Sequence, residues 1–133
     1  MNGSKKINVH LQRFLDTCSK EFGNHISFIA SKKEKELIEL SKNHVGQADI
    51  IIAIGGDGTL NEIINGVMLS ASHELPIIGI IPYGTGNDFY QSTFFSKFDF
   101  AEFLQALKHP TVILSDVGRI ETEGEIRYFL NVA

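Results

Sequence analysis

Two short polar loops carry the residues of this sequence that are best suited to bind an anion or a metal ion. The first loop is Gly55-Gly56-Asp57-Gly58-Thr59, and the second is Gly84-Thr85-Gly86-Asn87-Asp88. Glycines allow positive φ and leave no side chain between the backbone N–H groups and a ligand. A strand, a glycine turn and a helix N-terminus together bind anions, because the backbone N–H groups point at the ligand. The first loop therefore predicts a cradle for an anion, most readily a phosphate.

Asp57 and Asp88 are the carboxylates on which we expect chemistry to depend, since each lies beside glycines after an apolar run. Phosphoryl transfer uses carboxylates that hold Mg²⁺ against the phosphate oxygens, often through water. Each residue also has a purely structural interpretation. Asp57 can be a turn aspartate that bonds its own backbone, and Asp88 can be a helix N-cap. Spacing alone leaves both interpretations open.

The elements that must position these loops are two apolar runs, Ala48–Ile54 and Leu75–Ile81, in which isoleucine dominates. A nearly unbroken apolar run is typical of a strand buried on both faces, as in a parallel sheet between helices. In open α/β sheets, ligands bind beyond the carboxyl ends of the strands. The two loops follow those ends, so the sequence predicts one site built from both.

The segment between the loops is predicted to be a helix. Its apolar residues recur at helical spacing and form one face: Leu60, Ile63, Ile64, Val67, Met68 and Ala71. Thr59 and Glu62 fit a capping box, in which the side chain of each residue accepts a hydrogen bond from the backbone N–H of the other residue. We therefore expect this helix to begin at Thr59.

Apolar periodicity and breakers outline the rest of the chain. Pro110 ends the fourth predicted helix, and Thr122-Glu123-Gly124 is a turn signal. In order, these outer elements are a helix over 7–22 that ends at Gly23-Asn24, a short strand over 26–30, a helix over 32–44, a helix over 100–107, and hairpin strands over 111–121 and 125–132.

Composition excludes several classes of protein. The 133 residues are 43% hydrophobic, enough for the core of one globular domain, and the net charge of −4 argues against a nucleic-acid partner. The sequence contains no run of roughly 18 apolar residues, so no transmembrane segment is predicted. The N-terminus does not resemble a secretory signal. The only cysteine, Cys18, falls on an apolar helix stripe. We expect it to be a core residue in a reducing cytoplasm.

Neither loop fits the general nucleotide-binding motifs. The sequence has no G-x-x-x-x-G-K-[ST], and Asn61 and Phe89 occupy the last position of G-x-G-x-x-G in the two loops. The stretch from Gly55 to Gly66 instead resembles the first signature of the diacylglycerol kinase catalytic domain family of lipid kinases. Pro82 to Phe89 resembles its second. NAD kinases and phosphofructokinases carry relatives of the first loop, but the two blocks together are highly specific.

This resemblance implies a kinase that uses ATP and Mg²⁺ to phosphorylate a lipid hydroxyl, of diacylglycerol or a similar lipid. It implies that Asp57 is catalytic and organises the metal through water, with Asp88 as a further metal ligand. Thr59 and Thr85 would offer hydroxyls to phosphate, and Ser31 stands where the family has a nucleotide-contacting Thr. The nucleotide-binding residues expected on this basis are Ser31, Gly55, Gly56, Asp57, Gly58, Thr59, Asn61, Glu62, Gly84, Thr85, Gly86, Asn87 and Asp88.

The fold expected from the resemblance is α/β, with three layers and a mostly parallel sheet covered by helices on both faces, as in NAD kinases and phosphofructokinases. Residues 1–133 would form a single nucleotide-binding domain, ending in a β hairpin that leads toward an absent C-terminal β domain. In the family that domain holds the general base. The family's first strand ends in an Asn-Pro-x-Ser-Gly loop, of which Asn2-Gly3-Ser4 is the only echo, so this strand is expected to be lacking. An unpaired sheet edge would favour a homodimer.

The aromatic cluster after Asp88 has two interpretations. It could form an apolar lip for a lipid or a membrane surface, or it could be core; we favour core, with Phe94 and Phe95 as exceptions. The lipid interpretation predicts a cytoplasmic protein in peripheral contact with the inner face of the membrane. Two rival functions remain at this stage: an NAD-kinase-like enzyme, and a non-catalytic nucleotide-binding fragment.

Overall fold

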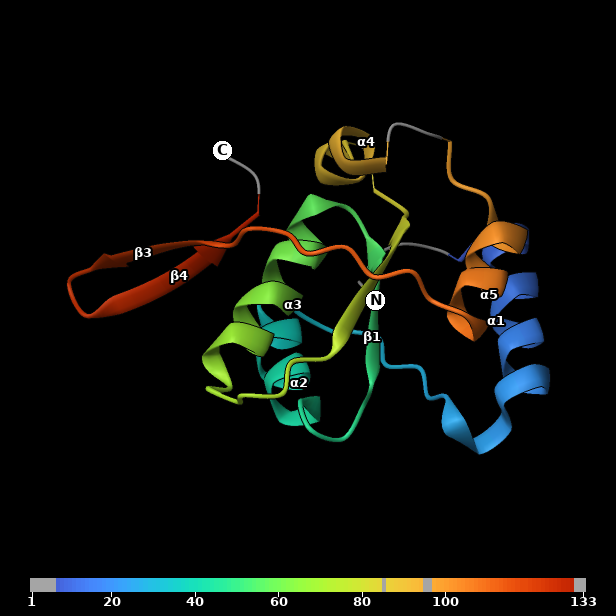
Figure 1. The fold of residues 1–133 in the computed structure, drawn as a ribbon, viewed down its shortest axis with the longest axis horizontal. Helices are drawn as coiled ribbons and strands as arrows, with labels where there is room; N and C mark the ends of the chain where they lie inside the picture. Colours follow the sequence, from blue (N-terminus) through green and yellow to red (C-terminus); the bar gives the residue numbers. More distant parts are fainter. Residues whose placement is uncertain (1–6, 85, 95–96, 131–133) are drawn as a thin grey trace.

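A computed structural model of the chain describes residues 7–84, 86–94 and 97–130 (Figure 1). Along these residues, two helices precede the first strand, one helix joins the first strand to the second, and two further helices precede the last two strands. In order, the elements are α1 (Val9–Phe22), the 3₁₀ turn η1 (Gly23–His25), α2 (Glu36–His44), β1 (Ile50–Gly55), α3 (Asp57–Leu69), β2 (Ile77–Pro82), α4 (Asp88–Phe94), α5 (Phe100–Lys108), β3 (Gly118–Thr122) and β4 (Glu125–Phe129).

Strands β1 and β2 form a parallel pair whose register runs from Ile50 opposite Ile77 to Gly55 opposite Pro82. Helix α3 makes the crossover that two parallel strands require. The prediction of two parallel strands joined by a helix is confirmed. Because both strands run in the same direction, the loops that follow them lie at the same edge of the pair.

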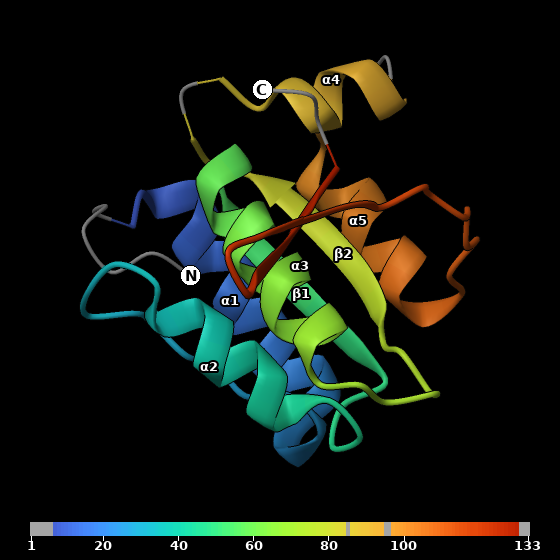
Figure 2. The same ribbon diagram turned by 90° about the vertical axis from the view of Figure 1, so that its left-hand side faces the viewer.

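The two faces of this strand pair pack against different helices. Ile54 and Ile81 pack with α1 and α5, whereas Ala53 packs with α2 and α3. Figure 1 shows α1 and α5 on one side of β1, and α2 and α3 on the other; Figure 2 gives the same arrangement from the side. The buried residues of the two clusters are Leu11, Phe14, Leu15, Cys18, Ile54 and Ile81 on the α1 side, and Leu37, Ala53, Leu60, Ile63, Ile64 and Val67 on the α3 side.

Most of the described aromatic residues after Asp88 are partly buried and pack against the two core clusters, as the core interpretation predicts. The rings of Phe98, Phe100 and Phe103 surround Phe14 of α1 or one another, with centroids 5.2 Å apart for Phe14 and Phe100. Phe94 is the expected exception, with 44% of its surface exposed. The other expected exception, Phe95, lies outside the described residues. The core interpretation therefore holds for the part of the cluster on α5.

Helices α2 and α3 approach so closely that only a glycine fits between them. A Cβ added at Gly66 would collide with the carbonyl oxygen of Ile38 and with the hydroxyl of Ser41. The Ser41 hydroxyl donates to the carbonyl of Leu37, at 2.7 Å, and so is paired within this contact. Gly66 thus sets the distance between the two helices that cover one face of the strands.

The C-terminal strands β3 and β4 pair in antiparallel register, with Gly118 opposite Phe129 and Thr122 opposite Glu125. Glu123 and Gly124 join them, and both have positive φ, of 49° and 81°. A two-residue turn with two positive φ angles matches the right-handed twist of the flanking strands. In Figure 1 this pair extends away from the body of the molecule on the α3 side.

Several predicted boundaries are wrong, either because a strand partner is missing among the described residues or because the local backbone departs from the helix. Residues 26–30 do not form a strand, and no strand of the described chain pairs with them. The helix predicted over 32–44 begins only at Glu36, after Lys35 adopts a left-handed φ of 64°. The strand predicted over 111–121 is limited to Gly118–Thr122, since residues 111–117 have no antiparallel partner among the described residues. The predicted end of the last strand, at 131–132, lies outside the described residues.

The capping box predicted for Thr59 and Glu62 is also wrong. Helix α3 begins earlier, at Asp57, with Gly56 as its N-cap and without a side-chain cap. Thr59 lies inside the first turn and is only 8% exposed. The Glu62 carboxylate instead accepts a hydrogen bond from the backbone N–H of Lys35, at 3.2 Å. A tertiary contact with the segment before α2 has replaced the local cap.

Candidate functional site

The two glycine loops are in direct backbone contact. The N–H of Tyr83 donates to the carbonyl of Gly55 at 2.8 Å, which extends the β1–β2 pairing into the loops. A Cβ added at Gly56 would lie 3.2 Å from the Cα of Gly84, and a Cβ added at Gly84 would collide with the Gly56 backbone. These two glycines are therefore required by the approach of one loop to the other, a role that the sequence analysis did not assign to them.

Asp57 links the loops through its side chain. One carboxylate oxygen accepts from the backbone N–H of Asp88 at 2.8 Å, and the other accepts from that of Phe89 at 3.1 Å. Helix α4 begins at Asp88, so Asp57 caps a helix that follows the other loop. The predicted alternative, a turn aspartate that bonds its own backbone, is replaced by a contact across 31 residues of sequence. Each carboxylate oxygen keeps a further lone pair for a ligand.

Asn87 closes the second loop on itself. Its side-chain oxygen accepts from the N–H of Gly84 at 3.2 Å, and its amide nitrogen donates to the Gly84 carbonyl at 2.9 Å. Asn87 has a φ of 55°, a left-handed conformation that asparagine adopts more readily than most residues. A Cβ added at Gly86 would lie 3.5 Å from Oδ2 of Asp57. Thr85 lies outside the described residues.

Asp88 is the first residue of α4, and its side chain is exposed. The N-cap interpretation of Asp88 is not what the structure shows, since Asp57 accepts from the first N–H groups of α4. Asp57 is likewise the first residue of α3. The structure thus joins the two predicted carboxylate residues directly, through the side chain of one and the backbone of the other.

The N-terminus of α3 is open. No side chain of the described residues caps it, although the first N–H groups of a helix have no partner within the helix. A Cβ added at Gly58 would meet nothing within 4 Å, so this glycine leaves the approach to the helix end clear. The Thr59 side chain lies over Gly55, where any Cβ would collide with it. Gly55, Gly58 and Thr59 therefore shape an uncapped helix end beside Asp57.

The remaining predicted site residues are not joined to the two loops. Ser31 is buried, Glu62 bonds to Lys35, and Asn61 is exposed with its carbonyl accepting from the Asn65 side chain at 2.8 Å. None of the hydrogen bonds of the described residues connects these three side chains to the glycine loops. The structure brings together Gly55 to Thr59 with Gly84 and residues 86–88, and it shows no bond from Ser31, Asn61 or Glu62 to them among the described residues.

Asn65 is an important residue that sequence reasoning missed. It is 6% exposed, its amide donates to the Tyr128 carbonyl at 2.8 Å, and its oxygen accepts from the Tyr128 N–H at 2.8 Å. The amide side chain therefore pairs with β4 as a neighbouring strand would. The sequence contained one signal for this role, since the amide of Asn65 lies among the apolar residues Ile63, Ile64 and Val67. A polar group on an apolar helix face must find a hydrogen-bond partner.

The described residues include no group of three or more His, Cys, Asp or Glu side chains that could hold a metal ion. Asp57 and Asp88 nevertheless supply the carboxylate oxygens that Mg²⁺ prefers, and this metal commonly completes its shell with water and phosphate oxygens. These two carboxylates are compatible with a metal that is held mainly by its nucleotide.

Cys18 is unsuited to nucleophilic chemistry. It is fully buried, and burial, followed by the negative charge of Glu21, raises the pKa of its thiol. A raised pKa lowers the fraction of thiolate, which is the reactive form. The prediction that Cys18 is a core residue is confirmed.

Residues 1–120 match the family model described as the diacylglycerol kinase catalytic domain. The chain belongs to this family. It is 40% identical over 94 residues to a protein of Staphylococcus aureus strain JH9 named "putative lipid kinase", covering 66% of this chain and 30% of that protein. The corresponding protein of strain Newman is 39% identical over the same length. The match thus spans about 30% of the length of these relatives.

A solved structure described as "a putative diacylglycerol kinase from Bacillus anthracis str. Sterne" is similar to this chain, with a TM-score of 0.63 and 25% identity. The similarity covers 80% of this chain and 37% of that structure. It supports the mixed α/β fold of a diacylglycerol kinase catalytic domain. Among the described residues, no helix is both long and apolar enough to cross a membrane.

Proposed function

We propose that this chain is the nucleotide-binding part of a lipid kinase that transfers the γ-phosphate of ATP to a lipid hydroxyl, with Mg²⁺ as cofactor. Family membership and the names of the relatives support the lipid kinase assignment. The proposal of an ATP site rests on the two hydrogen bonds that the Asp57 carboxylate accepts from the backbone N–H groups of Asp88 and Phe89, because they join the two loops.

Phosphate would bind at the open N-terminus of α3. Backbone N–H groups without partners and the positive end of the helix dipole favour an anion there. Gly58 keeps that end clear, and Gly56 and Gly84 hold the second loop against the first as the other wall. We therefore assign phosphate binding to Gly55–Thr59 and the second wall to Gly84–Asp88.

Asp57 would have two tasks in this site. It holds the start of α4 in place, and each of its carboxylate oxygens keeps a lone pair with which it would accept from a ligand. Mg²⁺ bound with the nucleotide neutralises the charge on the phosphates. Asp57 would orient a water molecule of its shell, and Asp88 would supply a second carboxylate from the exposed first turn of α4.

The wider fold and the lipid site form part of the proposal. We propose a three-layer domain whose final hairpin leads toward a β domain that supplies the general base. The acceptor is a diacylglycerol or a similar lipid, met by a cytoplasmic enzyme at the inner face of the membrane. Phe94 would offer an apolar contact to the lipid, since it lies on α4, directly after the second loop, and is 44% exposed. Its ring centroid lies 4.8 Å from that of Tyr90.

Calorimetric titration of Mg-ATP into the chain tests the site. We expect weak, saturable binding that is lost in Asp57→Ala. The matched control is Asp99→Ala, since Asp99 caps α5 by accepting from the N–H of Glu102 at 2.9 Å. Both substitutions remove a helix cap, at a cost of about 1 kcal/mol. Equal nucleotide binding by the two variants would contradict the proposed role of Asp57.

Asp57→Asn separates the two tasks of this residue. Its oxygen can still accept one N–H bond from the start of α4, but the negative charge is gone. We expect thermal stability close to that of the parent chain, with strongly reduced Mg-ATP binding. Full retention of binding would indicate that Asp57 serves only to cap α4.

A further inference from the structure

Tyr83 lies between β2 and the second glycine loop and is bonded on two sides. Its backbone N–H donates to the carbonyl of Gly55 in the first loop, at 2.8 Å. Its hydroxyl accepts from the backbone N–H of Asn8, also at 2.8 Å and 75 residues away in the sequence. Its ring packs against the core cluster on the α1 side. The residue that leads into the second loop is therefore tied both to the first loop and to the start of α1.

Asn8 offers Tyr83 a fixed partner, because it is the N-cap of α1. The side chain of Asn8 accepts from the N–H of Leu11 at 2.8 Å, and its carbonyl accepts from the N–H of Gln12 at 3.0 Å. These two bonds hold the backbone of Asn8 at the first turn of the helix. The N–H that donates to the Tyr83 hydroxyl thus belongs to the helix end and moves with it.

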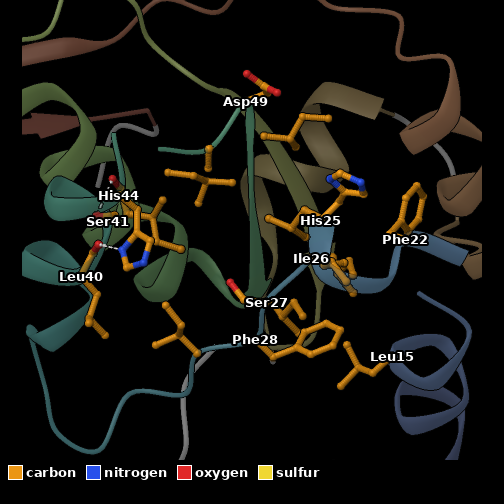
Figure 3. Close-up of a pocket in the computed structure, with 18 of the residues that line it drawn as sticks. Leu15, Phe22, His25, Ile26, Ser27, Phe28, Leu40, Ser41, His44 and Asp49 are labelled. Atoms are coloured by element: carbon orange, nitrogen blue, oxygen red, sulfur yellow. Dashed lines mark hydrogen bonds between the residues drawn. The ribbon is translucent and has the colours of Figure 1, made fainter. Parts of the chain in front are cut away.

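The bond between Asn8 and Tyr83 is separate from the groove that lies between α1 and α2. This groove has a volume of about 870 Å³, and Figure 3 shows Leu15 of α1 on one side of it and Leu40 of α2 on the other. Neither Asn8 nor Tyr83 lines the groove, nor does any described residue of the two glycine loops. The bond therefore belongs to the carboxyl end of the strands, where the loops lie.

The position of Tyr83 decides where the second loop begins. Gly84 follows directly, and a Cβ added at Gly84 would collide with the Gly56 backbone. The N–H of Gly84 donates to the Asn87 side chain at 3.2 Å, so a shift of Tyr83 changes both the contact between the loops and the closure of the second loop. A phenylalanine ring would fill the same space beside α1, but a tyrosine hydroxyl adds a directional bond. Packing alone does not supply this restraint.

We propose that Tyr83 is a positioning residue for nucleotide binding, because its hydroxyl anchors the second loop to the start of α1. The inference rests on the proposed function, in which Gly84–Asp88 form the second wall of the phosphate site. In this assignment Tyr83 acts through Gly84, whose approach to Gly56 sets the width of the site, and not by contact with the nucleotide. A merely structural hydroxyl would change the stability of the chain without changing the affinity of the folded chain for nucleotide.

Tyr83→Phe tests the inference, since it removes the hydroxyl and keeps the ring. In calorimetric titration with Mg-ATP, we expect the Kd to rise about three- to tenfold, the effect of one lost hydrogen bond. Without nucleotide, the amide of Gly84 should exchange hydrogen faster by NMR. The matched control is Tyr128→Phe, because Tyr128 lies on β4 and its bonds to Asn65 run through its backbone. This control should leave the Kd and the exchange at Gly84 unchanged.

A pair of substitutions at Asn8 tests the same bond from its other end. Asn8→Ala and Asn8→Pro both remove the side-chain cap, but only proline also removes the N–H that donates to Tyr83. The φ of Asn8, −79°, is one that proline adopts. Asn8→Pro should therefore raise the Kd beyond the value for Asn8→Ala. Combining Asn8→Pro with Tyr83→Phe should add nothing further, because both remove the same bond.

The inference is overturned if Tyr83→Phe binds Mg-ATP as tightly as the parent chain, or if its effect and that of Asn8→Pro add in full. A parent chain that does not bind Mg-ATP would contradict the proposed function, and hydrogen exchange then decides the role of Tyr83. Faster exchange at Gly84 in Tyr83→Phe, and not in Tyr128→Phe, would support the anchoring of the second loop. Equal exchange in the two variants would overturn it.

Discussion

The two halves of the first signature, Gly55 to Thr59 and Asn61 to Gly66, follow one another along the chain but differ in what they contact. The first half touches the second glycine loop, through Gly56 and Asp57. The second half touches the rest of the fold: Asn65 pairs with β4, and Gly66 packs against α2. One continuous motif therefore contains both a candidate site and the scaffold that holds it. Substitutions in the two halves should have separable effects.

The largest effect on stability should come from Gly66→Ala. Alanine favours a helix by about 1 kcal/mol over glycine, but here its Cβ collides with Ile38 and Ser41. Overpacking costs about 1–3 kcal/mol and occasionally more. Because this Cβ would meet a backbone carbonyl, we expect a cost at the top of that range or above it, and therefore a net loss of about 2 kcal/mol or more, measured by urea unfolding. Gly58→Ala is the control, since Gly58 lies in the same helix with open space around it. A gain for both variants would contradict the proposed packing role of Gly66.

Asn65→Ala should destabilise the chain by about 2 kcal/mol, because it leaves the N–H and C=O of Tyr128 without their partner. The loss should be local, with faster hydrogen exchange of the Tyr128 amide than in the parent chain. Asn61→Ala provides the comparison, since the side chain of Asn61 is exposed. If Mg-ATP binding falls more than stability in Asn65→Ala, then Asn65 contributes to the site and the proposed division of the motif is wrong.

Gly84→Ala tests the first half from the opposite loop. Its Cβ would collide with the backbone of Gly56 and push the loops apart. We expect Mg-ATP binding to weaken by about tenfold, or about 1.4 kcal/mol, with a smaller change in unfolding free energy. Gly56→Ala should be milder, because its Cβ lies 3.2 Å from the Gly84 Cα. The reverse order of the two variants in calorimetry would show that the contact does not control the site.

The smallest effect concerns Cys18, which lies outside both halves of the motif. Since burial raises its pKa in the folded chain, the unfolded chain loses the thiol proton first as the pH rises. Stability should be unaffected below the ordinary thiol pKa and should fall slightly as the pH rises from there toward the folded value. Cys18→Ser should abolish this slope in alkaline unfolding titrations. A thiol that reacts rapidly in the folded chain would contradict its assignment to the core.

Local patterns in the sequence were sufficient for much of the architecture. Isoleucine runs predicted parallel strands, and apolar spacing predicted α1, α3 and α5. The same patterns gave wrong predictions where the structure of a segment depends on residues that are distant in the sequence. Residues 26–30 have the composition of a strand but face a groove, and Thr59 has the spacing of an N-cap but lies inside α3.

For the candidate site, the sequence by itself determined which residues gather: the glycines, Asp57 and Asn87-Asp88, at the carboxyl ends of two parallel strands. Residue type and the direction of the strands are enough for that conclusion. Only the tertiary structure decided what these residues contact. Asp57 caps a helix 31 residues away, and Asn65 pairs with a strand 63 residues away. Local spacing carries no information about such pairs, because the polar groups that satisfy them come together only when the helices and strands pack.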